Sequence, residues 1–119
     1  MRDHTSLKAW QEARAVALSV IDLARTAWKP YASALFHQLQ KASLSVQLNI
    51  SEGYTFGDSP TFTRHLRIAY GSAVETAELL RLLAEAGILD ADAVAEAQKR
   101  NAQCQRLIMG LLKRRRARR

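Results

Sequence analysis

Apolar side chains recur every three or four residues along most of the chain, and this spacing restricts the fold more than any other feature of the sequence. Amphipathic helices have this spacing, because 3.6 residues complete one helical turn. The pattern is interrupted at Pro30, Pro60 and Gly87, which leaves four periodic stretches. No stretch of useful length alternates as a half-buried strand would. The sequence therefore predicts an all-α protein, an up-down-up-down four-helix bundle with short connections.

The expected helices cover about residues 7–28, 31–54, 60–86 and 91–112. Thr5 or Ser6 is expected to cap the first helix, Ser59 the third and Asp90 the fourth. The expected inward-facing residues are, helix by helix, Trp10, Ala13, Ala17, Val20, Ile21 and Ala24; Leu35, Leu39, Ala42, Val46, Asn49 and Gly53; Phe62, Leu66, Ala69, Ala73, Ala77, Leu80 and Ala84; and Val94, Ala97, Asn101, Cys104, Ile108 and Leu111.

Positive charge is concentrated at the C-terminus. The chain has 18 basic and 11 acidic residues, and the segment 113–119 holds six of the basic ones. We therefore predict one domain, residues 1–112, followed by a flexible basic tail, residues 113–119. Such a tail can bind nucleic-acid phosphates, an anionic membrane surface or an acidic protein, or it can simply be a solvated terminus. The candidate nucleic-acid-binding residues are Lys113, Arg114, Arg115, Arg116, Arg118 and Arg119, with Arg64 and Arg67 of the third helix.

Two of the expected helices have apolar residues on a second face. Leu44 and Leu48 project almost opposite to Val46, and three residues of the third helix lie well away from its stripe. Single exposed apolar residues are normal on monomers. The same feature on two adjacent helices instead favours a homo-oligomer interface. The candidate interface residues are Leu44, Leu48, Ile68, Leu79 and Leu82.

Asn49 and Glu52 are predicted to be buried polar residues near the end of the second helix. Asn49 falls in an otherwise apolar stripe, where a polar side chain must find a partner or lower the stability. Asn49 either makes a polar contact that fixes the register of the helices or belongs to a small ligand pocket at the end of the second helix.

The sequence offers little for catalysis. The histidines His4, His37 and His65 are isolated, and no Glu-x-x-His pair could build a helical metal site. Cys104, the only cysteine, falls on the core stripe as an inert thiol. We therefore expect no catalytic residue, metal ligand or cofactor, and thus no enzyme. Without an apolar run of membrane-spanning length or a secretory signal, a cytoplasmic location is expected.

The motifs resemble those of bacterial four-helix bundle proteins, the S23-like or 23S rRNA intervening-sequence proteins. The resemblance covers about residues 5–90, from Leu7-Lys8-Ala9-Trp10-Gln11-Glu12-Ala13 through helix two to Gly87-Ile88-Leu89. It is strongest at Leu35, Gln38, Lys41, Ala42, Ser45, Val46, Asn49, Ile50, Glu52 and Gly53, and it continues at Phe62, Leu66, Ile68, Ala69, Gly71, Ser72 and Glu75. Similar proteins include the accessory variability determinant of diversity-generating retroelements, and this similarity implies a homopentamer. The loop 54–58 departs from many relatives, because it has no basic residue and contains Asp58.

Two functions are consistent with these features. The first is a non-enzymatic oligomer that binds RNA or DNA through its basic surface and tail. The alternative is a structural adaptor that holds a partner protein such as a polymerase and has no direct role with nucleic acid.

Overall fold

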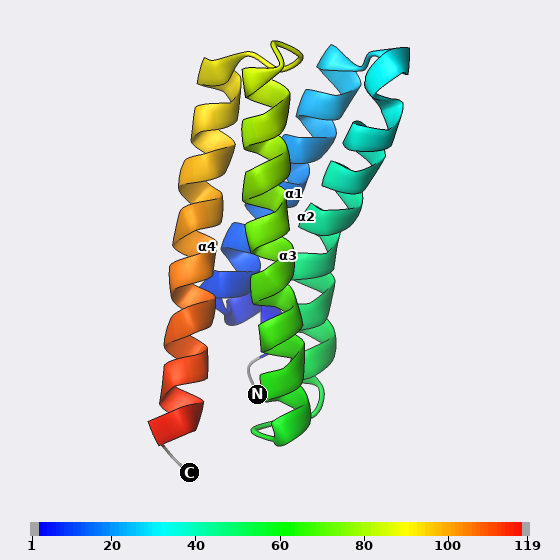
Figure 1. Ribbon diagram of the computed structural model, residues 1–119. Coiled ribbons are helices and arrows are strands. Elements are labelled where there is room, and N and C mark those ends of the chain that lie inside the picture. The colour runs from blue at the N-terminus through cyan, green and yellow to red at the C-terminus, as the bar shows by residue number, and fades with distance from the viewer. Residues whose placement is uncertain (1–2, 118–119) are drawn as a thin grey trace.

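The computed structural model describes residues 3–117, and every regular element within them is helical. The four α-helices are α1 (Lys8–Ala27), α2 (Ser33–Tyr54), α3 (Pro60–Glu85) and α4 (Ala91–Ala117). They run up and down in sequence order and are joined by short connections (Figure 1). The expected all-α four-helix bundle is confirmed.

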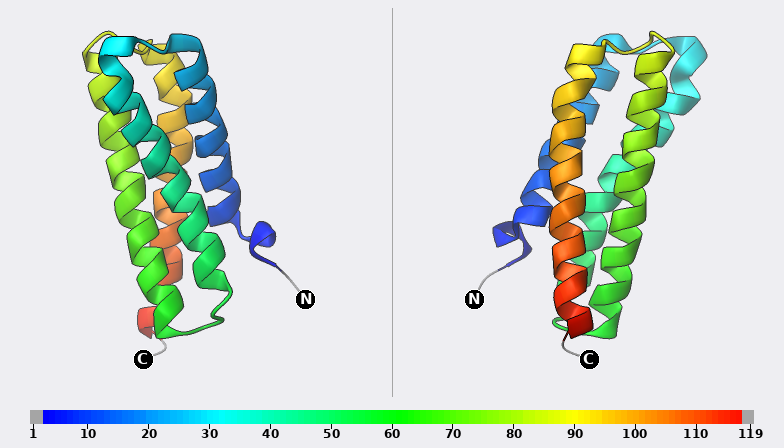
Figure 2. Two further views of the ribbon diagram at one scale, coloured as in Figure 1. Left: turned by 90° about the vertical axis from the view of Figure 1, so that its right-hand side faces the viewer. Right: turned by 60° about the vertical axis from the view of Figure 1, so that its left-hand side comes forward.

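Helices that are neighbours in sequence are also neighbours in space. α1 packs against α2 and α4, and α3 packs against the same two helices. The result is a rod of 46 × 21 × 20 Å with its core along the axis. At one end of the rod, the last turns of α4 lie beside the loop that joins α2 to α3 (Figure 2). The basic residues in the last described turn of α4 are therefore placed close to the start of α3.

The ends of α3 and α4 form as their sequences predict. The Ser59 side chain accepts a hydrogen bond from the Phe62 amide at 3.2 Å, and Pro60 follows at the first helical position. Gly87 has a φ of 73°, which is the left-handed conformation that ends many helices. The Asp90 carboxylate accepts from the Ala93 amide at 3.2 Å. These local contacts set the helix boundaries and the tight turn between the two helices.

The first helix begins differently from the prediction. Leu7 is its N-cap residue and provides no side-chain hydrogen bond. Residues His4–Ser6 form a 3-10 turn instead, and the Asp3 carboxylate caps that turn at the Thr5 amide, 3.0 Å away. The prediction that Thr5 or Ser6 caps the helix is therefore wrong, because both residues are used in a separate turn before it.

The buried residues follow the expected stripes with small displacements. In three places the residue after the expected one points inward: Phe36 rather than Leu35, Ile50 rather than Asn49, and Leu112 rather than Leu111. Trp10, Ala77 and Ala84 are half-buried. Ile21 is 48% exposed, so its assignment to the core was wrong. The cause is geometric: one residue turns the helix by about 100°, so a stripe read in steps of three and four drifts from the true inward face.

The boundary between domain and tail also differs from the prediction. α4 continues to Ala117, so residues 113–117 belong to the helix rather than to a flexible tail. Arg115 is buried within this extension, with 9% of its surface exposed. Arg118 and Arg119 lie outside the described residues. The apolar pattern of α4 continues through Leu111 and Leu112, directly before the basic residues. Because α4 packs against α1 and α3 up to this point, the helix continues into the basic segment.

Candidate nucleic-acid interface

Two adjoining cavities open along the surface between α3 and α4, and together we call them the α3–α4 groove. The first, of about 240 Å³, is lined by Arg67, Tyr70, Met109, Leu112 and Arg116. The second, of about 460 Å³, is lined by Tyr70, Ala102, Gln105, Arg106, Met109, Gly110 and Lys113. The two helices lie side by side over their whole length (Figure 2, right). No acidic residue lines either cavity, so the electrostatic character of the groove is cationic.

Helical spacing brings the cations into the groove. Lys113 and Arg116 are three residues apart on α4, and Arg106 precedes Lys113 by seven, which is about two turns. These residues therefore project from neighbouring positions on the side of α4 next to α3. Arg67 and Tyr70 have the same spacing of three on α3 and approach from the opposite wall.

The structure brings together only some of the predicted nucleic-acid-binding residues. Arg67 and Arg116 line the first cavity, and Lys113 lines the second. Arg64 is exposed on α3 but lines neither cavity. Arg114 faces the start of α1 and lines a different cavity of about 260 Å³ with residues 6–9. The predicted cluster is thus divided around α4, because successive residues of a helix point in different directions.

Arg115 has a structural role, so its prediction as a nucleic-acid-binding residue requires correction. Its guanidinium lies 3.1 Å from the Asp58 carboxylate and 4.1 Å from the centre of the Phe62 ring. The side chain thereby joins the end of α4 to the α2–α3 loop and to the first turn of α3. Asp58, the acidic residue of the loop 54–58, is the partner of this arginine.

The residues of the groove that sequence reasoning missed include Tyr70, Arg106 and Met109. Tyr70 and Met109 are shared by both cavities. Arg106 contacts Gln103 on the same helix, and its guanidinium donates to the Gln103 Oε1 at 2.7 Å. The seven-residue spacing between Arg106 and Lys113 was a usable signal for this face. Nothing in the sequence shows that Tyr70 would lie opposite that face.

The predicted buried polar pair is divided. Asn49 is half-buried, and its side-chain nitrogen donates to the Ser45 carbonyl at 2.9 Å. Its Oδ1 lies 2.9 Å from Nδ1 of His65 on α3. Glu52 is exposed, so its assignment as a buried residue was wrong. Asn49 links α2 to α3 in a polar row that also contains the pairs Ser45–Ser72 and Gln38–Glu75, and this arrangement favours the register interpretation.

Most of the candidate interface residues are solvent-exposed in the single chain. The exposed fractions of Leu44, Leu48, Ile68 and Leu82 lie between 43% and 47%. Leu79 is different, because it is half-buried and packs against the core. Exposed apolar residues that sequence reasoning missed include Leu18 and Ile21 on α1 and Val74 on α3.

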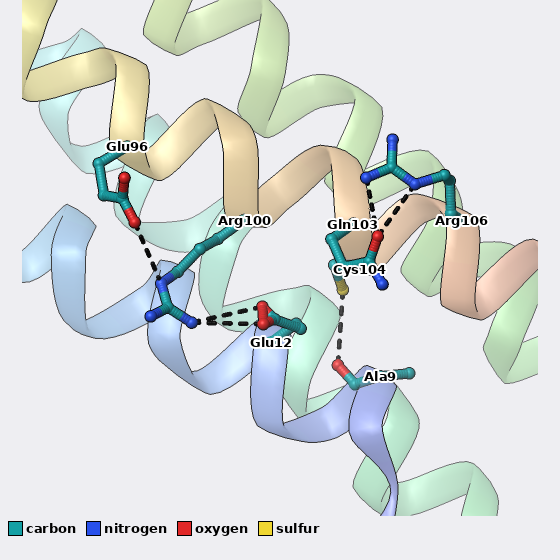
Figure 3. A network of polar contacts seen from close by, with 7 residues as sticks. All are labelled: Ala9, Glu12, Glu96, Arg100, Gln103, Cys104 and Arg106. Carbon is teal, nitrogen blue, oxygen red and sulfur yellow. Dashed lines mark hydrogen bonds and ion pairs between the residues drawn. The ribbon is translucent and has the colours of Figure 1, made fainter.

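The remaining polar contacts are structural. Arg100 on α4 lies between Glu12 of α1, at 3.3 Å, and Glu96, at 3.7 Å (Figure 3). Cys104 is buried nearby, and its burial raises the pKa of the thiol to about 12, which keeps it neutral. Within residues 3–117, no three His, Cys, Asp or Glu side chains are grouped so that they could hold a metal ion. No helix in this range is long and apolar enough to cross a membrane.

The fold and the groove define the class of this protein: a small four-helix bundle with a cationic surface between its last two helices. Residues 5–110 match the model of the 23S rRNA-intervening sequence protein family, and the chain belongs to that family. Its fold is similar to the crystal structure of a protein with unknown function from the S23 ribosomal protein family of Bacteroides thetaiotaomicron VPI-5482, with a TM-score of 0.65 and 18% identity over 86% of this chain and 98% of the other. No curated protein matches the chain. The resemblance to the family is confirmed, whereas the relation to the retroelement accessory protein stays a prediction.

Proposed function

We propose that this protein is a non-enzymatic nucleic-acid-binding protein and that the α3–α4 groove is its binding surface. The observation that carries the proposal is the convergence of Arg67, Lys113 and Arg116 on adjoining cavities that no carboxylate lines. The family name, which refers to an intervening sequence of 23S rRNA, supports the same class of ligand.

The chemistry of the groove suits a phosphate backbone. Arginine offers a planar fork of donors that matches phosphate oxygens, and lysine adds a mobile point charge. Contacts of this kind position a nucleic acid without reading its sequence. If three or four cations engage duplex DNA, log K should change with log salt by a slope of about −3 to −4.

Point substitutions test the groove better than deletion of residues 113–119. The deletion would also remove Arg115, whose contacts with Asp58 and Phe62 tie the end of α4 to the bundle. The double variant Arg67→Gln/Arg116→Gln removes two charges from one cavity. Its matched control is Arg25→Gln/Lys29→Gln, which removes two charges from exposed positions in the last turn of α1 and just after it.

The measurement is fluorescence anisotropy of labelled RNA and DNA oligonucleotides, titrated with protein at several salt concentrations. We expect the groove variant to bind about tenfold more weakly, equivalent to about 1.4 kcal/mol. The salt slope on duplex DNA should become shallower by about 2, because two phosphate contacts are lost. The control should behave like the wild type. Equal affinities of the two variants, or no binding by the wild type at low salt, would overturn the proposal.

We also propose that the chain self-associates through its exposed apolar residues. Leu44 and Leu48 lie on the outer side of α2, and Ile68 and Leu82 lie on the outer side of α3. The pentamer implied by the family resemblance is one form of such an assembly. A partner protein that occupies these residues in place of a second copy would favour the adaptor function.

A further inference from the structure

We propose that the α3–α4 groove selects an unpaired stretch of nucleic acid, with one base held against Tyr70 and the phosphates on the cations at either side. This inference rests on the proposed function, since it names the form of nucleic acid that the same groove takes. It depends on the position of one aromatic ring, whereas the proposed function depends on charge.

Tyr70 lies where the two cavities of the groove meet. It is half-buried, packs with part of its surface on the core and lines both cavities with the remainder. Met109 on the opposite wall is also shared by the two cavities. The centre of the groove therefore has an aromatic and a thioether surface, which suits the flat face of a base better than a phosphate.

The cations lie on both sides of this apolar centre. Arg67 and Arg116 line the cavity on one side, and Arg106 and Lys113 line the cavity on the other. Arg106 and Arg116 are ten residues apart on α4, which corresponds to about 15 Å along the helix. A strand of a few nucleotides spans that length. A short strand can therefore follow the groove and place a base at its middle.

The lining of the groove favours an unpaired strand over a duplex, because the centre of the groove is apolar. The larger cavity, of about 460 Å³, lies within the size range of small-molecule sites, and Gly110 leaves its wall open because nothing lies within 4 Å of an added Cβ. A paired base is enclosed by its neighbours in the stack and cannot present its face to a side chain. Unpaired bases in single strands and loops can stack on aromatic side chains.

The test compares three ligands and three proteins. The ligands are a labelled 12-nucleotide RNA, a DNA of the same sequence and the corresponding duplex DNA, and binding is measured by fluorescence anisotropy. The proteins are the wild type, Tyr70→Leu and Tyr70→Phe. Leucine keeps the apolar packing on the core but removes the ring, whereas phenylalanine keeps the ring. Circular dichroism melts establish that both variants are folded.

We expect Tyr70→Leu to bind both single strands about tenfold more weakly, because an aromatic stack is lost. Tyr70→Phe should retain wild-type affinity, and duplex binding should stay within about twofold for all three proteins, because phosphate contacts alone hold a duplex. A 2-aminopurine base in the middle of the single strand should lose fluorescence on binding to the wild type and to Tyr70→Phe, but not to Tyr70→Leu.

The outcomes separate the two proposals. If Tyr70→Leu binds single strands like the wild type while Arg67→Gln/Arg116→Gln weakens all ligands, this inference is wrong and the proposed function stands. Preference of the wild type for the duplex also overturns this inference alone. If no ligand binds to the wild type, both proposals are wrong.

Discussion

Arg115 shows how one charged residue can become part of the bundle instead of its binding surface. Its side chain is buried, with the guanidinium over the Phe62 ring and next to the Asp58 carboxylate. A cation over an aromatic face is stabilising, and the long aliphatic stem of arginine buries apolar surface as well. The residue therefore contributes to stability at the end where α4 meets α3.

We expect Arg115→Ala to lower the free energy of unfolding by about 1–2 kcal/mol, because the cation–π contact and the buried stem are both lost. Asp58→Asn should cost less than about 1 kcal/mol, because the carboxylate is largely exposed. Arg114→Ala, at an exposed position on the adjacent residue, serves as the control and should stay within about 0.5 kcal/mol. Urea denaturation followed by circular dichroism measures all three. An Arg115→Ala protein as stable as the control would contradict this role.

At the scale of the helices, α2 and α3 pack so closely at Gly53 that a larger residue would not fit there. A Cβ on Gly53 would lie 2.7 Å from the Cβ of His65 and 2.8 Å from Cδ1 of Phe62. The His65 Cβ is attached directly to the α3 backbone, so it cannot move without moving that helix. The polar row between α2 and α3, which includes Asn49 and His65, depends on the same spacing.

Gly53→Ala should therefore destabilise the protein by about 1–3 kcal/mol, as overpacking does. At an ordinary helical position, the same change stabilises by about 1 kcal/mol, because alanine has the higher helix propensity. Gly110→Ala provides that comparison, since nothing lies within 4 Å of its added Cβ. The midpoints of thermal unfolding should move in opposite directions for the two variants. A higher midpoint for Gly53→Ala would show that α3 can move away from the added methyl group without loss of stability.

At the scale of the whole molecule, the bundle leaves two kinds of surface uncovered. The α3–α4 groove is cationic, whereas the outer sides of α2 and α3 carry leucine and isoleucine side chains that are nearly half exposed. Exposed apolar residues that lie near one another on adjacent helices are typical of surfaces that associate. A cationic groove and an associating face are compatible, because Ile68 and Leu82 line neither cavity of the groove.

We expect light scattering at micromolar concentration to give the mass of a multimer for the wild type. Leu48→Glu should shift the mass towards that of one chain, because a carboxylate would be buried without a partner in the interface. Ala95→Glu introduces the same charge at an exposed position of α4 and should leave the mass unchanged. A wild type that scatters as a single chain would rule out self-association.

The amino-acid sequence by itself determined the number, type and approximate limits of the helices. These properties are local: Ser59, Asp90 and Gly87 act within one turn of their own position, and the apolar period is visible within each stretch. The sequence also showed that basic residues are concentrated at 113–119, and from this we predicted that they form one binding cluster.

Only the tertiary structure decided which of these cations meet. Lys113 and Arg116 face α3, Arg114 faces α1 and Arg115 turns into the bundle, although all four are consecutive in sequence. Their directions depend on the rotation of α4 about its own axis, and the packing of Ile108 and Leu112 in the core sets that rotation. Charges along a helix are a property of the sequence, but a groove requires two walls, and the second wall comes from residues some forty positions away.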